Sequence, residues 1–502
     1  MSGKAARRSS SIDAEYQPIP QAPVAAGPPA RRSLDISTLG EEDTVDILED
    51  APEIIVDRKI RAIYFVLGCA VLLPWNAMIT ATPYFMSRLD GTPLKASFSS
   101  YLSMAFMVPN LIFLAHATAT AKQSLSTSRI SWSLLLIAFV TAALTLGTWI
   151  HVHPGLFFAL VLLAAMLKSA AGSYLQSSVV ALASLFGHEA MQAVMSGQAA
   201  VGVAVSGVQV LSAAASTHRV PPPSPQVRDE QLERTPEETS ASLFFGLSTV
   251  FLFVAYVVHV WLKTLPAYKA VVARQRLRAP VRLPISDGLG SADETRGLTT
   301  SGPLHKGPNG KTQMLRLGRL NLPYNFAVGY VFMVTLSVFP PITVSIQSTN
   351  PATHPLLFSA IHFFIYNVGD FTGRSLCSFP RLHVWSAKRL LTFSLARTLF
   401  VPLFLMCNIQ WASPTAMKPV ITSDALYMLI LVLFGVTNGY VSSMSMMSAP
   451  SIAHNPRLKG RMEDVDIAAT VATFCLVIGL TMGSVASFAV RAMVCNCNPF
   501  RN

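Results

Sequence analysis

Eleven long runs of apolar residues constrain this chain more than any other feature. Each run holds about 20 mostly apolar residues, the length that a helix needs to cross the roughly 30 Å hydrocarbon core of a bilayer. The runs lie near 60–83, 97–119, 130–151, 155–186, 189–214, 241–263, 322–346, 355–378, 388–410, 424–448 and 466–492. Only 13% of the residues are charged, about half the share in soluble proteins. We therefore predict an all-α integral membrane protein with 11 transmembrane helices.

The hydrophilic stretches between the runs predict how the chain is divided. Residues 1–58 are expected to form a disordered tail, followed by a six-helix bundle over 59–263. Residues 264–321 are rich in Arg, Pro and Gly and lack helical periodicity, which predicts a flexible linker. A five-helix bundle is expected over 322–494, with a short tail at 495–502.

The net charge of +12 lies mostly in the loops rather than in the apolar runs. Zinc-finger, basic-zipper and RNA-binding signatures are absent from the sequence, so we expect the bilayer and not nucleic acid to be the partner of these charges. With the amino terminus inside, the loops on that side hold 18 Lys and Arg and those on the other side hold six. Because positive loops stay in the cytoplasm, we predict a cytoplasmic amino terminus, tail and linker, and a lumenal or extracellular carboxyl terminus.

Two ionisable side chains inside the run at 355–378 are the clearest candidates for function. Asp370 precedes Arg374 by one helical turn, and Phe363 and Asn367 fall on the same helix face. A charge within a membrane span is costly unless it faces protein or water, and such charges usually line a substrate path. The alternative is a buried structural pair that touches no ligand. The first interpretation predicts a water-filled cleft beside the pair.

Glycine and proline in the runs are predicted to shape the helices. Gly369 and Gly373 are four residues apart, a spacing that lets a second helix approach closely. The segments 339–343 and 438–440 contain Pro or Gly beside polar residues, and kinks or hinges are their expected role. Pro74 is expected to break the first helix, so that the adjacent Trp75 either faces a cavity or serves as an interfacial anchor.

The run at 155–186 carries two more candidate residues. The amide of Gln176 could read a nucleobase edge or could form an interhelical hydrogen bond. Gly172, one turn away, would leave room for a planar ring. Lys168 lies a further turn back without an acid nearby in sequence. The alternatives for it are a solvated vestibule, a link to Asp370, or a buried amine that sits neutral. No zinc-protease, nucleophile-elbow or phosphate-loop motif occurs, so we expect no enzyme activity, metal or cofactor.

These interruptions, taken together and in order, resemble the motifs of the equilibrative nucleoside transporter family over residues 60–492. The matching motifs are Leu72–Asn76 with Thr80–Thr82, Gly172 with Gln176, Ser196–Gln198 with Gly202, Phe339–Pro340 with Thr343, Asn367–Leu376, Asn438–Tyr440, and Gly479–Leu480 with Gly483.

The resemblance implies a major-facilitator-like fold in a 6+5 arrangement, with a nucleoside such as adenosine or uridine bound between the halves. It implies that Trp75, Gln176, Asp370 and Arg374 bind substrate. It also implies a cavity lined by Asn367, Phe363, Ile79 and Leu480. Lys168 and Asn110 depart from the family pattern, and with Asn438 they are possible path residues. These departures leave the substrate range and a possible proton co-substrate open.

The sequence thus favours facilitated diffusion of nucleosides by alternating access, with nucleobases as a second candidate substrate class. A major-facilitator carrier of another polar solute, such as a sugar or a drug, is the alternative, and a membrane scaffold that acts through its tails is a third class. Acidic segments before 47–48 and 54–55 resemble sorting signals, so either a vacuolar or lysosomal membrane or the plasma membrane is expected.

Overall fold

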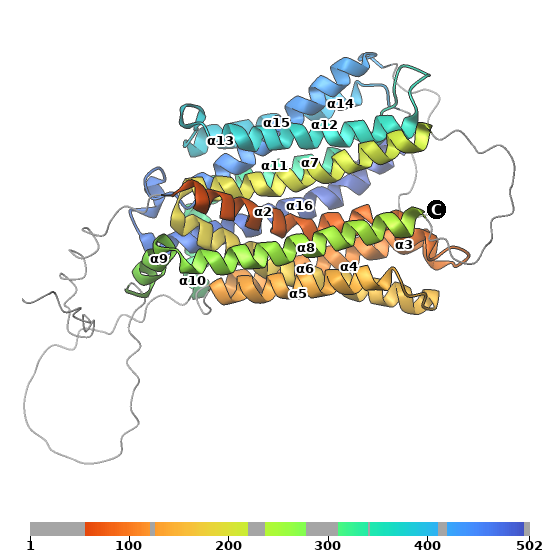
Figure 1. Cartoon of the computed structure of the whole chain (residues 1–502). Helices are drawn as coiled ribbons and strands as arrows, with labels where there is room; N and C mark the ends of the chain where they lie inside the picture. The colour runs from red at the N-terminus through yellow and green to blue at the C-terminus, as the bar shows by residue number, and fades with distance from the viewer. Residues whose placement is uncertain are drawn as a thin grey trace, which may run out of the picture. The chain divides into compact units, whose positions relative to one another are not determined.

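The computed structural model describes residues 56–120, 126–218, 236–277, 310–339, 342–409 and 419–495. Helices dominate these residues (Figure 1). The helices before residue 278 are α2 (Arg58–Thr80), α3 (Thr82–Ser87), α4 (Leu94–Ala119), α5 (Ser126–Gly147), α6 (Pro154–Phe186), α7 (His188–His218), α8 (Pro236–Thr264) and α9 (Pro266–Leu277). Those after residue 309 are α10 (Gly310–Leu320), α11 (Leu322–Val338), α12 (Pro355–Leu376), α13 (Ala387–Ala396), α14 (Phe400–Leu405), α15 (Asp424–Ser448) and α16 (Val465–Cys495), with short 3-10 turns between some of them. We call α2 to α8 the N-terminal group and α11 to α16 the C-terminal group.

Eight segments are long and apolar enough to cross a membrane: Arg58–Ser87, Tyr101–Ala119, Thr127–Gly147, Pro154–Phe186, His188–Ala215, Glu237–Thr264, Asp424–Ser448 and Met462–Val490. Helix α11 is a shorter apolar helix. Helix α12 and the pair α13 and α14 occupy the positions of the predicted eighth and ninth spans. A helical membrane protein is thus confirmed, whereas the count of 11 spans stays a prediction.

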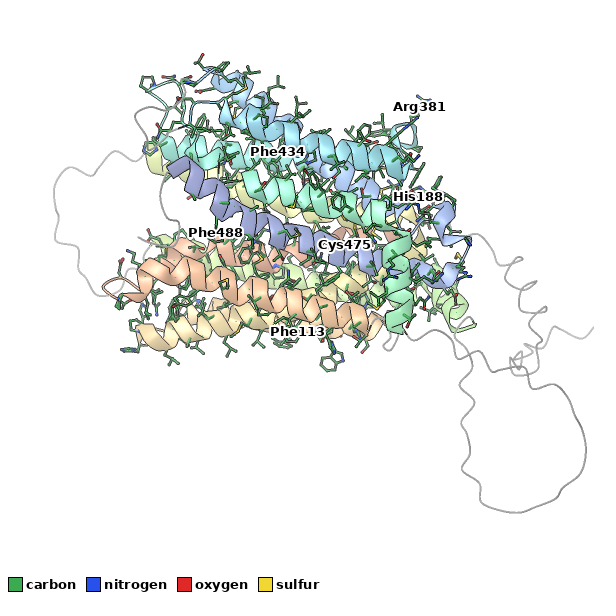
Figure 2. All side chains as sticks on the ribbon, turned by 180° about the vertical axis from the view of Figure 1, so that it is seen from behind. Phe113, His188, Arg381, Phe434, Cys475 and Phe488 are labelled. Atoms are coloured by element: carbon green, nitrogen blue, oxygen red, sulfur yellow. The ribbon has the colours of Figure 1, made fainter. Side chains whose placement is uncertain are left out.

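Large apolar side chains on the outer faces of these helices fit a lipid environment. Trp132, Leu211, Leu243 and Val485 are each at least 67% exposed. Figure 2 shows such side chains along the helices, with Phe113 on α4 and Phe488 on α16 labelled. Apolar surface this extensive is rare on soluble monomers and marks a surface that contacts membrane or protein.

Each group of helices has its own close packing, and a few helices join the groups. Helix α2 packs on α7, α4 on α6, and α5 on α8, while α12 packs on α15 and α11 on α16. Between the groups, α7 packs on α12 and α16 packs on α6 and α4. Figure 1 shows α7 beside the C-terminal group. The boundary between the two groups therefore runs along α7 and α12 on one side and along α6 and α16 on the other.

Three local expectations are wrong. Helix α2 continues through Pro74 and ends at Thr80, so Pro74 does not break it. Helix α2 packs closely on α7 two turns before this point, since a Cβ at Gly197 of α7 would lie 2.1 Å from the Phe65 carbonyl oxygen. Helix α15 likewise runs without interruption through 438–440. In contrast, α11 ends at Val338, eight residues before the expected end of that span, because the extended residue before a proline cannot continue a helix.

Helices α9 and α10 extend into the two ends of the predicted linker at 264–321 and form its described parts. Helix α10 is short and gains its stability from tertiary contacts. Leu317 is fully buried against α16, and Arg316 lies 2.5 Å from the carboxylate of Asp464. Eleven residues are too few to show a clear period in the sequence, and such a helix depends on packing rather than on propensity. Residues 278–309 lie outside the described residues.

Candidate functional site

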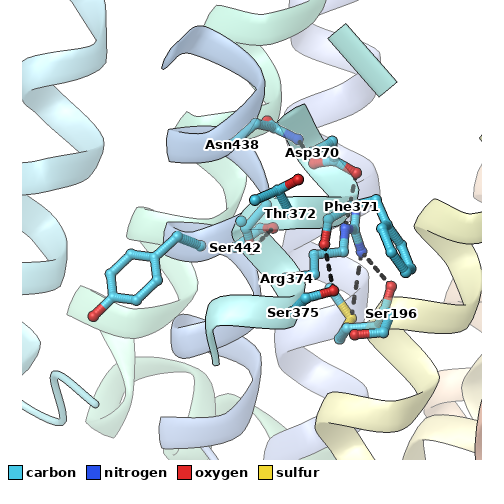
Figure 3. Close-up of polar contacts among 12 residues, drawn as sticks. Ser196, Asp370, Phe371, Thr372, Arg374, Ser375, Asn438 and Ser442 are labelled. Atoms are coloured by element: carbon cyan, nitrogen blue, oxygen red, sulfur yellow. Dashed lines mark hydrogen bonds and ion pairs between the residues drawn. The ribbon is translucent and has the colours of Figure 1, made fainter. Parts of the chain in front are cut away.

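Asp370 and Arg374 form the ion pair that their spacing predicts. Arg374 Nε donates to Asp370 Oδ2 at 2.9 Å, one turn apart on α12. The other carboxylate oxygen, Oδ1, accepts from Asn438 Nδ2 of α15 at 2.6 Å. Figure 3 shows Asn438 and Arg374 reaching Asp370 from two sides. Both carboxylate oxygens are therefore held by protein donors, as a buried carboxylate requires.

Glycines bring α12 and α15 close enough for this contact. A Cβ at Gly373 would lie 2.1 Å from the Val436 carbonyl oxygen, and one at Gly439 would lie 2.0 Å from the Asp370 carbonyl oxygen. Gly369 is similarly close to α15. The predicted packing role of Gly369 and Gly373 is thus confirmed. Gly439, expected at a kink, instead admits the backbone of α12.

Arg374 also joins the two helix groups. Its Nη1 donates to the carbonyl oxygen of Met195 on α7 at 3.1 Å. Gln192, one turn earlier on α7, donates from Nε2 to the carbonyl oxygen of Arg374 at 3.3 Å and to Ser378 Oγ at 2.8 Å. The substrate-site candidates on α12 thus lie at the contact between the N-terminal and C-terminal groups.

Within the described residues, the ion pair is almost fully covered rather than open to a water-filled cleft as we expected. Asp370 and Arg374 are 6% and 5% exposed. Helix α7 covers the pair because the Met195 carbonyl oxygen takes up an Arg374 donor that faces away from Asp370. The pair is therefore in a covered arrangement here, and any ligand would have to displace the contact with α7.

The other two predicted residues of this helix face are half-buried. Asn367 Nδ2 donates to the Phe363 carbonyl oxygen at 2.9 Å, and its Oδ1 lies against α7, 2.5 Å from where a Cβ on Gly202 would be. The Phe363 ring lies 5.1 Å from that of Phe339. Asn367 therefore lies on the face that meets α7, whereas Phe363 contacts the residue that follows α11.

The two candidates on α2 lie in the C-terminal part of that helix. Trp75 is half-buried, with its ring centroid 4.6 Å from that of Phe106 on α4. Ile79 is 41% exposed one turn later. Leu480 on α16 is also half-buried. These three side chains keep apolar surface that is available to a ligand or to lipid.

On α6, the amide of Gln176 is unpaired among the residues that the structure describes, and the space beside Gly172 is unfilled. No hydrogen bond from the half-buried Gln176 side chain to any of the described residues is found. A Cβ on Gly172 would meet no atom within 4 Å. The interhelical hydrogen bond considered for Gln176 is therefore not formed within the part of the chain that the structure describes.

Lys168 is not linked to Asp370. It is fully buried, its Nζ has no hydrogen-bond partner among the residues that the structure describes, and the ring of Phe245 on α8 lies 5.7 Å away. Its surroundings on α6 and α8 are apolar, so the solvated vestibule that we expected is not found either. Asn110 serves an interhelical contact, because its Oδ1 accepts from Ser173 Oγ of α6 at 2.8 Å.

The structure thus brings only part of the predicted set together. Asp370, Arg374 and Asn438 are in direct contact. No hydrogen bond, ion pair or ring contact within the described residues joins Trp75 or Gln176 to them. The two sets belong to opposite helix groups, so a ligand between the groups would have to bridge them.

Four residues at the site were missed from the sequence: Gln192, Met195, Thr335 and Arg397. Arg397 is buried within the predicted span at 388–410. The rule that singled out Asp370 and Arg374 applies to it equally and could have found it. Met195 contributes its backbone carbonyl and, at 4.0 Å, its sulfur atom, and no sequence pattern signals either contact.

Aromatic side chains close one end of the helix groups. At the end where the chain turns at Gly187, which we call the Gly187 end, the His188 ring lies 5.8 Å from that of His383 and 5.7 Å from that of Trp385. Trp385 stacks on His454 at 3.8 Å. His188 belongs to the N-terminal group and the other three lie in loops of the C-terminal group, so this ring cluster spans the boundary.

Comparisons with known proteins agree with the arrangement of these helices. The chain is 27% identical to mouse equilibrative nucleoside transporter 2 over 469 residues, which cover 86% of this chain and 96% of that relative. It is 26% identical to human equilibrative nucleoside transporter 1, with 87% and 98% covered. The crystal structure of the E. coli fucose:proton symporter superposes with a TM-score of 0.50 at 14% identity over 89% of this chain and 94% of that one. This likeness shows a fold of the major facilitator kind.

The sequence profile described as "Nucleoside transporter" matches residues 162–492, about two thirds of the chain. This match includes α12, α15 and α16 and most of α6. The resemblance of the motifs to the equilibrative nucleoside transporters is thereby confirmed. The chain belongs to the nucleoside transporter family.

Proposed function

We propose that this protein moves nucleosides such as adenosine and uridine across a membrane by facilitated diffusion. The family and the relatives are transporters rather than enzymes, and the helices are those of a multi-pass membrane protein. The observation that carries the proposal is a carboxylate and a guanidinium, buried in α12 where this helix meets α7 of the other group.

The ion pair has the chemistry that a ribose requires. A carboxylate accepts hydrogen bonds from hydroxyl groups, and a guanidinium donates through several N–H groups at once. Asp370 accepts two hydrogen bonds in this structure and keeps further lone pairs for a ligand. Arg374 would gain a free N–H donor when the Met195 carbonyl moves away. We assign ribose recognition to these two residues. Trp75 is assigned to gating or stacking.

We assign recognition of the base to Gln176. Gln176 and Asp370 lie ten and six residues from the ends of α6 and α12 at the Gly187 end. One nucleoside between the two helix groups is proposed to contact both, with Gly172 leaving room for its ring. Asn367, Phe363, Ile79 and Leu480 are proposed to line the same path.

Transport would follow from exchange between two arrangements of the helix groups. Here the ring cluster closes the Gly187 end and Arg374 binds Met195. Separation of α7 from α12 would break both contacts and uncover the ion pair. Substrate shifts this equilibrium only by binding one arrangement more tightly than the other.

The orientation and the membrane belong to the same proposal. The excess of Lys and Arg in the loops supports a cytoplasmic amino terminus and places the Gly187 end in the cytoplasm. We propose a vacuolar or lysosomal membrane or the plasma membrane. The candidate sorting segments before residue 56 lie outside the described residues. A proton gradient across the vesicles in the assay below would show whether a proton is co-transported.

The test is uptake of labelled adenosine and uridine by proteoliposomes. Wild-type protein should take up both, and Asp370→Ala or Arg374→Ala should reduce uptake to background. Arg381→Ala is a matched control, because this exposed arginine lies outside the site. Uptake by both site variants at the control rate would remove the assigned roles. Competition by unlabelled glucose, but not by nucleosides, would instead indicate a carrier of another solute.

A further inference from the structure

A second arginine is buried near the ion pair without a carboxylate of its own. Arg397 lies between α13 and α14 and is only 1% exposed. Its Nη1 donates to the Phe434 carbonyl oxygen at 2.9 Å and to Thr437 Oγ1. Its guanidinium carbon is 4.5 Å from the Phe434 ring centroid. No ion pair to Arg397 is found among the described residues, although a buried charge needs compensation.

A chain of hydrogen bonds connects Arg397 to the carboxylate of Asp370. Arg397 Nη2 donates to Thr335 Oγ1 of α11 at 2.9 Å. Thr335 Oγ1 lies 2.7 Å from Asn438 Oδ1 of α15, and Asn438 Nδ2 lies 2.6 Å from Asp370 Oδ1. Arg374 completes the chain from the other side of Asp370. One carboxylate thus lies between two guanidiniums.

The directions of the outer hydrogen bonds in this chain are determined by the chemistry of its ends. A guanidinium only donates, so the Thr335 hydroxyl must accept from Arg397. A carboxylate only accepts, so Asn438 must turn its NH₂ group toward Asp370 and its oxygen toward Thr335. The hydroxyl proton of Thr335 has two acceptors at 2.7 Å, Asn438 Oδ1 and the carbonyl oxygen of Val331. When it points to Asn438, the bonds align from Arg397 to Asp370 and reinforce one another.

We propose that Arg397 is a positioning residue for the substrate site, which orients Asp370 and compensates its charge through Thr335 and Asn438. This inference rests on the proposed function and deepens it. It assigns different tasks to the two arginines. Arg374 binds Met195 of the other helix group and loses this contact when the groups separate. Arg397, Thr335 and Asn438 all belong to the C-terminal group, so their support of Asp370 persists through the cycle.

A purely structural role for Arg397 would require only its bonds to the α15 backbone and to Thr437. The Thr335 hydroxyl distinguishes the two roles, because it links Arg397 to Asn438 without being needed for the contact with α15. Removing this hydroxyl should therefore weaken substrate binding while the helices stay packed.

The experiment compares Thr335→Val with Thr335→Ser in the proteoliposome assay, with KM and maximal rate measured for adenosine and uridine. Valine keeps the volume but lacks the hydroxyl, and serine keeps the hydroxyl. We expect Thr335→Val to raise KM about tenfold, the effect of losing a hydrogen bond in a charged network, and Thr335→Ser to stay within about twofold of wild type. Arg397→Lys should behave like Thr335→Val, because an ammonium cannot reproduce the planar fork.

Thr473→Val is the matched control. Thr473 is also fully buried, and its hydroxyl donates only to the Ala469 carbonyl oxygen within α16, at 2.9 Å. Its KM should match wild type. Thermal unfolding in detergent checks that all variants fold, and Thr335→Ala replaces Thr335→Val if the latter does not accumulate.

Equal KM values for Thr335→Val, Thr473→Val and wild type would overturn the positioning role and leave the proposed function intact. Normal uptake by Asp370→Ala would overturn both, because no site would remain for Arg397 to position. The two failures are therefore distinguishable in one set of vesicles.

Discussion

Buried charge distinguishes the residues that we propose for the substrate site from the rest of the chain. Asp370 is the one acid buried in contact with Arg374, and Asn438 completes its partners. Spacing in the sequence predicts the ion pair, because one turn of α-helix brings residues four apart together. The bond to Asn438 joins residues 68 apart in sequence, so only the crossing of α12 and α15 creates it.

Gln176 provides a test of base recognition at the residue scale. Its amide has no partner among the described residues and lies beside the open space at Gly172. We expect Gln176→Ala to weaken the binding of purine nucleosides by about tenfold, the effect of losing a paired amide contact. Free ribose analogues, which lack the base, should be affected much less. Competition against labelled adenosine measures both, and equal losses would argue against base reading.

Glycine determines how the helices of the site approach one another. The backbones of α12 and α15 meet at Gly369, Gly373 and Gly439 with no room for a Cβ. The spacing of Gly369 and Gly373 predicts this approach, but their partner helix could not be identified from the sequence. Helix α10 could not be identified from spacing at all. It is held by contacts of Leu317 and Arg316 with residues more than 140 positions away in sequence.

Gly439→Ala tests the helix crossing at the scale of elements. The new Cβ would lie 2.0 Å from the backbone oxygen of Asp370, so the helices must separate. We expect a loss of about 1–3 kcal/mol of stability and loss of uptake, because Asn438 would no longer reach Asp370. Thermal unfolding of the purified protein measures the first effect.

The matched control for this crossing is Gly172→Ala, where a Cβ meets nothing within 4 Å. Its unfolding temperature should be unchanged or slightly raised, because alanine favours a helix over glycine by roughly 1 kcal/mol. If both variants unfolded at the same temperature, close packing at Gly439 would not be what holds α12 and α15 together.

On the scale of the whole molecule, the Gly187 end determines which arrangement of the helix groups this structure represents. The ring cluster of His188, His383, Trp385 and His454 joins loops of both groups. Arg61 and Glu189 lie 3.8 Å apart beside it on α2 and α7. Together with the bond from Arg374 to Met195, these contacts cover the ion pair.

Acid should weaken this closure. Partial burial first, and the charge of His383 second, lower the pKa of His454 below its ordinary value of 6.5. A base with a lowered pKa in the closed arrangement binds its proton more readily in the open one. Closure is therefore fully stable above the ordinary pKa and weakens as the pH falls through it toward the lowered value. Glu189, which faces His188, opposes this effect only partly, since its own partner is Arg61.

Spin labels at the exposed positions Lys59 and Arg381, in a variant without native cysteines, measure this opening as a distance between the two helix groups. We expect longer distances at pH 5.5 than at pH 7.5. The substitution His454→Gln should remove the part of the change that depends on this residue. Distances that do not change with pH in the wild-type background would show that the ring cluster does not sense protons.

The sequence by itself determines that this chain crosses a membrane as helices, since runs of about 20 apolar residues have no other stable environment. It also determines the ion pair on α12 and the glycine spacing, because both are local properties of one helix. Tertiary structure alone decided that Lys168 is buried apart from Asp370, and that Arg397 reaches Asp370 through Thr335 and Asn438. The physical reason is that these outcomes depend on contacts between helices far apart in the chain, and no spacing along one helix encodes which neighbour will fill its surface.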